Sequence, residues 1–271
     1  MLKKIYLDLN AFKQISTHDN KEFIDKVRLI DKGKFAITYS VAHLEELKSS
    51  NHYGASTSEH IEKDLSVYNT YADKILKPDP FYAININGNL YMEHILCIDE
   101  YAEEAYEVIS NTIDRNDIVE AINRWILEKA IEANDPENDN LEILQKLRSY
   151  IVLHLVNLGL LPSKDFDIAM NWNFSDIKEK FYLVEIYIEL ASRILETSGM
   201  NKDREKIKKK KTIEQIARSW THDTSHVIYA SYCEFFICND EKLRNKARAI
   251  YKFLEVPTVI LDLNEFIDYK F

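Results

Sequence analysis

Residues 220–260 read WTHDTSHVIYASYCEFFICNDEKLRNKARAIYKFLEVPTVI, and this stretch decides the expected fold class. A helical apolar pattern follows Asp223, and a short apolar strand is predicted over 235–238. A second helix over about 241–254 and a second strand over 258–261 complete a helix–strand–helix–strand unit. Alternation of this kind predicts a parallel sheet with helices on its faces.

The amino-terminal end of the chain shows the same alternation. The run KKIYLD at residues 3–8 is rich in β-forming residues and predicts a buried strand. A helical pattern over about 11–30 follows, with a polar break near 17–20, and then a second strand is predicted over 35–39. Ser40 is expected to cap a further helix, which is predicted in the sequence SVAHLEELKSS. We therefore expect an α/β protein whose sheet is built from both ends of the chain.

The middle of the chain, residues 51–211, is dominated by long helical patterns. An amphipathic helix is predicted over 57–76, and Asn87-Gly88 between alternating apolar arms predicts a small hairpin. Further helices are predicted over 93–111, 115–133, 140–158, 175–197 and 212–220. We interpret residues 1–50 and 212–271 as two halves of one α/β domain, and residues 51–211 as a mostly α-helical insertion or subdomain.

Composition excludes several classes of protein. The chain has 271 residues and 46% hydrophobic content, enough for a substantial core. Asp8 and Asn10 interrupt the first apolar run, so the amino terminus does not read as a signal peptide. The longest apolar stretch, 150–161, is too short to span a bilayer. The three cysteines have neither metal-type spacing nor a disulfide framework. We expect a soluble cytoplasmic protein without a membrane partner.

Charge is segregated along the sequence, although the net charge is −10. Residues 93–142 contain fifteen acids and three bases, whereas residues 201–221 contain eight bases and three acids. Four consecutive lysines, Lys208, Lys209, Lys210 and Lys211, lie in the basic run. Two interpretations are open: a solvated acidic helix face with a lysine-rich linker, or a lysine cluster that binds the phosphates of a nucleic acid.

Acidic residues recur where the predicted strands end. Asp8 follows the first strand, Glu45 and Glu46 lie in the helix after the second, and Asp240 follows the strand at 235–238. Asp223 is expected to open a helix at the same edge, where ligands of parallel sheets bind. Each acid alone is typical of a cap or a turn. Carboxylates brought together need a neutralising cation, and oxygen ligands favour Mg²⁺ or Mn²⁺. Such metals support in-line hydrolysis of phosphodiesters.

The order of these motifs resembles the PIN-domain nucleases. The resemblance covers residues 1–50 and 215–271 and implies a twisted parallel sheet flanked by helices, with a metal-dependent nuclease site. It implies a metal site of four carboxylates, Asp8, Glu46, Asp223 and Asp240, with Asn10, Ser40, His226 and Asn239 in supporting roles. The motifs that carry it are IYLDLN at Asp8 and Asn10, ITYSVAHLEEL at Ser40 and Glu46, HDTSHVIYAS at Asp223 and His226, and FFICNDEKL at Asn239 and Asp240.

Three features depart from the family pattern. Leu9 stands where a small or hydroxylated residue is usual, and Cys238 stands where Thr or Ser often precedes the last acidic pair. The long helical insertion is absent from the compact toxin-type members, so their antitoxin partners do not carry over. The choice between adjacent glutamates is also open: the spacing from Ser40 and the following Leu47 favours Glu46, while helix periodicity does not exclude Glu45.

Two further residues have competing interpretations. His226 lies one helical turn after Asp223, so it either orients that carboxylate, contacts substrate or is a packed histidine. Asp262 lies in a segment, LDLNEF, that nearly repeats residues 7–12. The resemblance assigns no catalytic acid after the last strand, and we interpret Asp262 as a turn residue.

The chemistry and the resemblance together predict a magnesium- or manganese-dependent endonuclease. RNA is favoured as the substrate, with single-stranded DNA as the second choice. One alternative is a PIN-like nucleic-acid-binding or scaffold protein without turnover. Another is a haloacid-dehalogenase-type phosphatase, against which Asn10 argues because that chemistry requires a second aspartate there. A homo-oligomer, a protein partner and an inhibitor all remain open.

Overall fold

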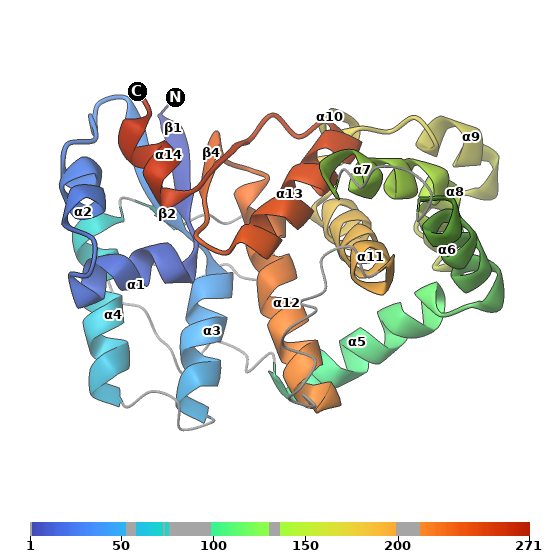
Figure 1. Ribbon diagram of the computed structural model, residues 1–271, viewed down its shortest axis with the longest axis horizontal. Coiled ribbons are helices and arrows are strands. Elements are labelled where there is room, and N and C mark those ends of the chain that lie inside the picture. The colour runs from blue at the N-terminus through green and yellow to red at the C-terminus, as the bar shows by residue number, and fades with distance from the viewer. Residues whose placement is uncertain (1, 53–57, 73, 76–98, 130–135, 199–211) are drawn as a thin grey trace. The chain divides into compact units, whose positions relative to one another are not determined.

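The computed structural model describes residues 2–52, 58–72, 74–75, 99–129, 136–198 and 212–271 (Figure 1). The hairpin expected at Asn87-Gly88 and the lysines Lys208–Lys211 lie outside the described residues. None of the described helices is both long enough and apolar enough to cross a membrane.

The centre of the fold is a parallel sheet of five strands in the order β3-β2-β1-β4-β5. All four strand pairings are parallel. This confirms the predicted α/β class, with a sheet drawn from both ends of the chain. The strands are β1 (Lys3–Leu7), β2 (Phe35–Tyr39), β3 (Lys74–Ile75), β4 (Phe235–Ile237) and β5 (Val259–Leu261).

Strand β3 is a correction to the sequence analysis. The helix expected over 57–76 is α4 (Ser58–Tyr71), and it ends before the strand. Lys74 and Ile75 then pair with Thr38 and Tyr39. The free edge of β2 can accept these backbone hydrogen bonds, and tertiary pairing of this kind overrides local helical periodicity.

The register brings three strand ends to one edge of the sheet. Ile5 of β1 pairs with Ile37 of β2 and with Phe235 of β4. The Asp8 N–H extends the ladder by donating to the carbonyl oxygen of Ile237 at 2.9 Å. The residues that follow β1, β2 and β4 therefore share the carboxyl edge, where ligands of parallel sheets bind.

The helical pattern expected over 11–30 forms two helices, α1 (Leu9–Thr17) and α2 (Lys21–Arg28), which are separated at the polar break expected near 17–20. His18 ends α1 with a φ of 60°, and the Asn20 side chain caps α2. Further helices with residues in the sheet-containing part include α3 (Val41–His52), α12 (Ile213–Ala230), α13 (Glu241–Leu254) and α14 (Leu263–Asp268). Within this part, α1 packs on α4, and α14 packs on α2 (Figure 1).

The expectation that Asp223 opens a helix is wrong. Asp223 lies inside α12, which begins ten residues earlier at Ile213. Thr212 and Gln215 explain this start: the Gln215 N–H donates to the Thr212 hydroxyl at 3.3 Å, and the Thr212 N–H donates to the Gln215 side chain at 3.2 Å. This reciprocal pair is a capping box, which marks a helix amino terminus. The segments expected as separate helices therefore form one.

The remaining helices pack around α11 (Phe181–Ser198), whose buried side chains include Val184, Ile188 and Leu195. Helices α6, α7, α8 and α10 contact α11. This group is α5 (Asp99–Ile113), α6 (Asn116–Lys129), α7 (Pro136–Lys146), α8 (Arg148–Asn157), the 3-10 helix η2 (Ser163–Asp165), α9 (Phe166–Ala169) and α10 (Phe174–Ile177).

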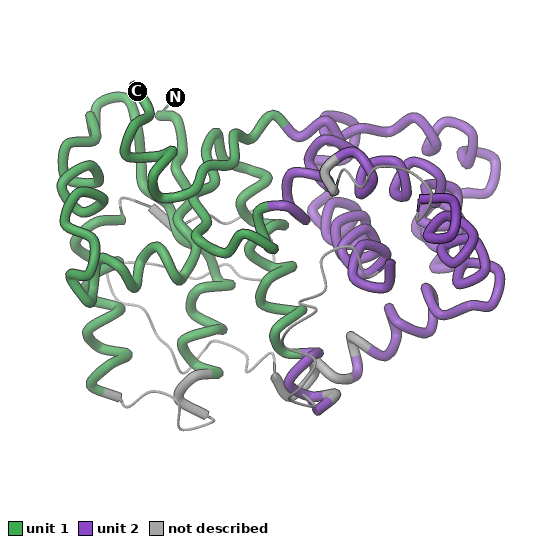
Figure 2. The backbone as a smooth tube through the Cα atoms, in the orientation of Figure 1, with its two compact units in different colours: residues 1–102, 218–244, 257–271 green, residues 103–217, 245–256 purple. Residues whose placement is uncertain are grey.

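The chain forms two compact units (Figure 2). Unit 1 comprises residues 1–102, 218–244 and 257–271, and unit 2 comprises residues 103–217 and 245–256. The sequence analysis divided the chain differently, into 1–50 with 212–271 and the insertion 51–211. Residues 58–71 belong to unit 1 because α4 packs on α1 and α3.

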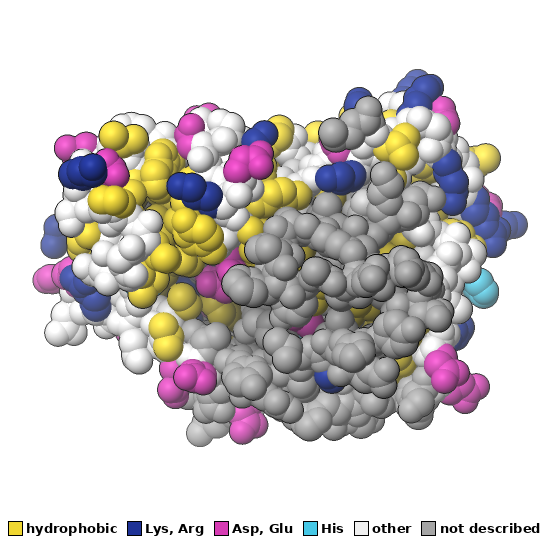
Figure 3. Space-filling model, turned by 180° about the vertical axis from the view of Figure 1, so that it is seen from behind, with side chains coloured by type: hydrophobic (Ala, Val, Ile, Leu, Met, Phe, Trp, Pro, Cys, Tyr) yellow, Lys and Arg dark blue, Asp and Glu magenta, His cyan; other side chains and the backbone are white. Residues whose placement is uncertain are grey.

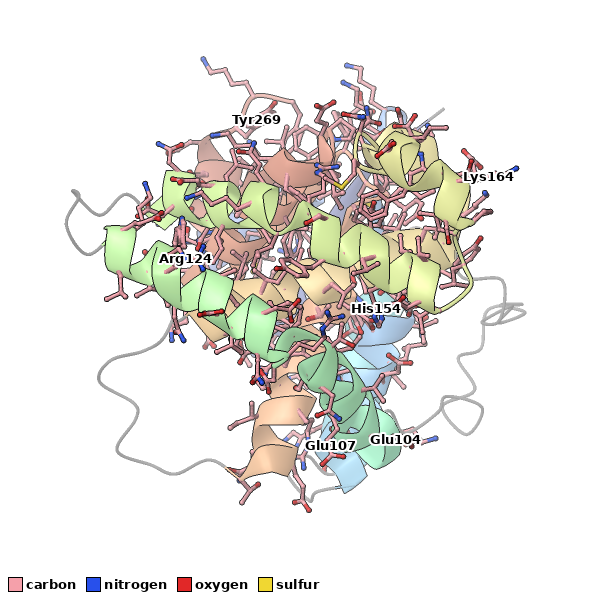
Figure 4. The ribbon with its side chains drawn as sticks, turned by 90° about the vertical axis from the view of Figure 1, so that its right-hand side faces the viewer. Glu104, Glu107, Arg124, His154, Lys164 and Tyr269 are labelled. Atoms are coloured by element: carbon pink, nitrogen blue, oxygen red, sulfur yellow. The ribbon has the colours of Figure 1, made fainter. Side chains whose placement is uncertain are left out.

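The acidic run of the sequence lies largely on exposed helix faces in the described residues. Glu104 and Glu107 are exposed on α5 (Figure 4), and Asp114 and Asp117 are exposed beyond it. Asp139 is buried, and the Lys129 ammonium lies 3.6 Å from its carboxylate. On the face in Figure 3, described acidic and basic side chains lie among apolar ones. These exposed acids agree with the interpretation of a solvated acidic surface.

Candidate functional site

Asp8 directly follows β1, and hydrogen bonds from two backbone N–H groups fix its carboxylate. It caps α1, with Oδ1 accepting the Ala11 N–H at 2.6 Å. Its other oxygen, Oδ2, accepts the N–H of Asn239, which follows β4, at 3.3 Å. Only 2% of Asp8 is exposed, and it forms no ion pair within the described part of the chain. A buried carboxylate therefore joins two strand ends at the predicted edge.

The environment of Asp8 disfavours its charged form. Burial raises the pKa of Asp8 above its ordinary value, and the negative charge of Glu46 raises it further. Hydrogen bonds from the Cys238 thiol and the Ala11 N–H, together with His226, oppose this rise in pKa without cancelling it. A cation at this position would favour the ionised carboxylate.

Glu46, on α3, is the second carboxylate of the site. Its Oε2 lies 3.1 Å from Nε2 of His226 on α12. The Glu46 side chain is 28% exposed, whereas the His226 side chain is only 4% exposed. Burial alone would raise the pKa of Glu46, but the hydrogen bond and charge of His226, with His222 and Lys13, bring the pKa below its ordinary value. Glu46 is thus held ionised, with part of its surface accessible.

The neighbouring glutamate faces a different environment. Successive helical residues are rotated by about 100° about the helix axis, so adjacent side chains point in different directions. Glu45 is only 3% exposed, and it is Glu46 that contacts His226. Of the two adjacent glutamates, Glu46 is therefore the one that contacts His226.

Tyr6 links β1 to the residues that hold Glu46, and the sequence analysis did not single it out. Its hydroxyl lies 2.7 Å from Oγ of Ser40 and 2.9 Å from Nδ1 of His226. With a neutral His226 whose Nε2–H donates to Glu46, the Tyr6 hydroxyl donates to Nδ1; with a protonated ring, Nδ1–H donates to the Tyr6 hydroxyl instead. Tyr6 and Ser40 have no exposed surface. The hydrogen bonds that link Ser40, Tyr6 and His226 therefore orient Glu46 and offer no accessible nucleophile.

His43 is a buried structural histidine beside these hydrogen-bonded residues. Its Nδ1 accepts the Ser40 N–H at 3.1 Å, so the neutral ring carries its proton on Nε2, which donates to the Leu7 carbonyl at 2.7 Å. Burial, together with His226, places the pKa of His43 well below its ordinary value. The neutral ring ties the start of α3 to the end of β1.

The residues after β4 approach Asp8 mainly through the backbone. Asp240 is exposed, and its Oδ1 accepts the N–H groups of Lys242 and Leu243 at 2.8 and 3.0 Å, capping α13. Burial, then Asp8, raises the pKa of the Cys238 thiol, which therefore stays neutral; the thiol donates to the Asp240 carbonyl oxygen at 3.6 Å. Asn239 is exposed and supplies its N–H to Asp8.

His226 does not orient the Asp223 carboxylate, which was one of the roles considered from the sequence. Both ring nitrogens of His226 face other partners, Glu46 and Tyr6, so His226 orients Glu46 instead of Asp223. Asp223 is half-buried on α12. Asn10 is exposed in the first turn of α1. Asp262, which we interpreted from the sequence as a turn residue, caps α14 in a capping box.

Asp8 and Glu46 are linked electrostatically, because the negative charge of Glu46 contributes to the raised pKa of Asp8. No group of three or more His, Cys, Asp or Glu side chains in the described residues is arranged to hold a metal ion. The two carboxylates have the oxygen chemistry that suits Mg²⁺ or Mn²⁺, and the burial of Asp8 without an ion pair is compatible with a cation. Asp240 follows β4 at the same carboxyl edge of the sheet as Asp8.

Comparison of the chain with protein-family models, with curated protein sequences and with solved structures finds no match.

Proposed function

We propose that this chain is a PIN-like, metal-dependent endonuclease with RNA as its preferred substrate. The observation that carries the proposal is Asp8, a buried carboxylate without an ion pair among the described residues, beside the ionised Glu46. Both belong to the carboxyl edge of a parallel sheet, the usual position of ligand sites in α/β proteins. The proposal includes a helical insertion within the PIN-like domain.

In this proposal Asp8 and Glu46 bind Mg²⁺ or Mn²⁺, and Asp223 and Asp240 complete the set of carboxylates. A bound divalent cation supplies charge stabilisation at the phosphate and activation of water. The protein contributes orientation. Tyr6 and His226 hold Glu46, while the Ala11 and Asn239 N–H groups hold Asp8.

The test is cleavage of a single-stranded RNA and a matched single-stranded DNA by purified protein with Mn²⁺ or Mg²⁺. Asp8→Asn is the diagnostic variant, because asparagine also caps helices; it removes the charge and replaces one of the two acceptor oxygens with an amide group. Asp262→Asn is the matched control, since Asp262 caps α14 in the same way. We expect cleavage by the wild type and by Asp262→Asn, loss with Asp8→Asn and loss with chelator. Equal cleavage by Asp8→Asn would contradict the proposal.

A second candidate is a PIN-like protein that binds nucleic acid, or acts as a scaffold, without turnover. The observation that favours it is the absence of a metal-type group of three ligands among the described residues. Asp240 also uses one oxygen to cap α13. RNA binding that does not depend on metal, with no cleavage under any metal condition, would support this candidate.

A further inference from the structure

Tyr68, on α4, is a buried tyrosine next to the candidate site. Its ring stacks on Tyr39 with centroids 5.2 Å apart and planes 13° apart. The rings of Phe12 and His43 pack edge-on against it, with centroids at 4.5 and 5.6 Å. Tyr68 is 1% exposed. Contacts from α1, β2 and α3 therefore fix the ring.

The hydroxyl of Tyr68 has no hydrogen-bond partner among the residues that the structure describes. A buried tyrosine hydroxyl normally has a partner, because leaving it without one costs free energy. A phenylalanine would fill the same space without that cost. An unpartnered hydroxyl in such a rigid position is therefore a candidate donor to a ligand.

The carboxylates of the site influence this hydroxyl. Burial raises the pKa of Tyr68 well above its ordinary value, and Glu46 and Asp8 are among the charges that raise it further. The phenol therefore remains protonated and can only act as a neutral partner, most usefully as a donor. Its hydroxyl is buried, so a ligand that accepts its hydrogen bond must enter the site to reach it.

A positive charge accompanies this donor. Lys13 lies on α1, which packs on α4, and its charge contributes to the lowered pKa of Glu46. Lys13 is half-buried and forms no ion pair with a carboxylate in the described ranges. Two carboxylates alone would repel a phosphate, whereas a hydroxyl donor and an ammonium group favour it.

We propose that Tyr68 is a substrate-binding residue whose hydroxyl donates a hydrogen bond to a phosphate oxygen of RNA at the Asp8–Glu46 site, with Lys13 as the accompanying charge. The proposal rests on the nuclease function proposed above and adds α4, outside the residues of the PIN resemblance, to the substrate contacts.

The experiment measures binding of a fluorescein-labelled single-stranded RNA by anisotropy in chelator, where no metal-dependent cleavage occurs. Tyr68→Phe should weaken binding by about tenfold, the usual order for one hydrogen bond to a charged group. Its melting temperature should stay equal or rise, because a buried hydroxyl without a partner is removed. Tyr39→Phe, which alters the stacked neighbour, should bind RNA as the wild type does. Lys13→Gln should weaken binding and lower the salt slope by about 0.7.

The outcomes separate this inference from the nuclease proposal. Wild-type affinity in Tyr68→Phe would overturn the inference, even if the wild type cleaves RNA. Equal weakening in Tyr39→Phe would also overturn it, because the effect would then belong to ring packing. Loss of affinity in Tyr68→Phe alone, in a protein that never cleaves RNA, would support the contact and contradict the nuclease. Absence of RNA binding by the wild type would overturn both.

Discussion

Glu46 and His226 are 180 residues apart in the sequence, and their Oε2 and Nε2 atoms lie 3.1 Å apart. This contact joins α3, from the amino-terminal half of the sheet, to α12, from the carboxyl-terminal half. Tyr6, on the central strand β1, supports the far side of the His226 ring. The position of Glu46 therefore depends on both ends of the chain.

The first prediction separates the two adjacent glutamates. Glu46→Gln should abolish RNA cleavage, because it removes the partly accessible carboxylate. Glu45→Gln should keep most of the activity, since Glu45 is buried and it is Glu46 that contacts His226. Cleavage rates, with circular dichroism as the folding control, check this. Loss of activity in Glu45→Gln alone would transfer the ligand role to Glu45, and equal tolerance of both changes would contradict a nuclease centre.

The second prediction concerns metal binding and stability. Mn²⁺ or Mg²⁺ should raise the melting temperature, because a ligand that binds only the folded state stabilises it, by about 2.7 kcal/mol at a hundredfold excess over Kd. Calorimetry with and without the metal measures the shift. The double variant Asp8→Asn with Asp240→Asn should lose the shift, and Asp262→Asn should keep it. A double variant that responds as the wild type does would place the metal elsewhere.

The sheet could be predicted largely from sequence, because its strands are short apolar runs. The predicted strand at 35–39 has the bounds of β2, and the run at 3–8 is one residue longer than β1. The two residues of β3 could not be predicted in the same way. Lys74 and Ile75 have no strand pattern of their own and are defined by their pairing with the edge of β2.

The site could be predicted in part. Asp8 follows from its position after a strand and before a helix, where aspartate is a favoured cap. The link from Tyr6 to His226 spans 220 residues, and no local pattern reports such a contact. One signal was available: a tyrosine inside a fully buried central strand requires a partner for its hydroxyl. Asp223 was misplaced because Thr212 and Gln215, not Asp223, form the helix cap.

The third prediction concerns acid stability. The folded protein keeps His43 neutral, with its pKa well below the ordinary value, while the unfolded chain binds a proton near pH 6.5. The unfolded state therefore binds more protons below about pH 6.5, and stability falls as the pH decreases. The slope from one such proton approaches about 1.4 kcal/mol per pH unit.

Denaturant unfolding between pH 7 and pH 5 measures this effect. His43→Gln should be less stable at pH 7, because it loses the fitted ring, but its stability should depend less on pH. His18→Asn is the control, since His18 is exposed and asparagine tolerates its positive φ. An unchanged pH slope in His43→Gln would contradict the assignment.

The fourth prediction concerns the helical unit. The Arg148 guanidinium donates to the carbonyls of Trp172 and Phe253, both at 2.7 Å, and stacks on the Phe253 ring at 4.1 Å. Arg148→Met should reduce the free energy of unfolding by about 3 kcal/mol, through the loss of two charge-assisted hydrogen bonds. Arg148→Lys should recover only part of this, because an ammonium group cannot make the planar, two-way contact. A loss below about 0.5 kcal/mol in Arg148→Met, measured by urea unfolding, would contradict this role.

The fifth prediction concerns the four lysines Lys208–Lys211, the densest basic cluster of the sequence. A site lined by carboxylates repels phosphate, so part of the affinity for RNA must come from positive charges elsewhere. The cluster precedes α12, the helix that carries His226. Each phosphate contact with single-stranded RNA adds about 0.7 to the slope of log affinity against log salt. Replacing all four lysines by glutamine should therefore weaken binding and reduce that slope by up to about 2.8.

The matched control replaces four exposed lysines elsewhere, Lys3, Lys21, Lys32 and Lys34. Three of them lie near the amino ends of β1 and β2, at the edge of the sheet opposite Asp8. This variant has the same change in net charge, so it corrects for general electrostatic attraction. RNA affinity at several salt concentrations compares both variants with the wild type, and the Mn²⁺-induced melting shift should survive in both. Equal slopes in all three proteins would make the Lys208–Lys211 cluster a solvated linker, and Lys13 and Tyr68 would then be the first residues to test for phosphate binding.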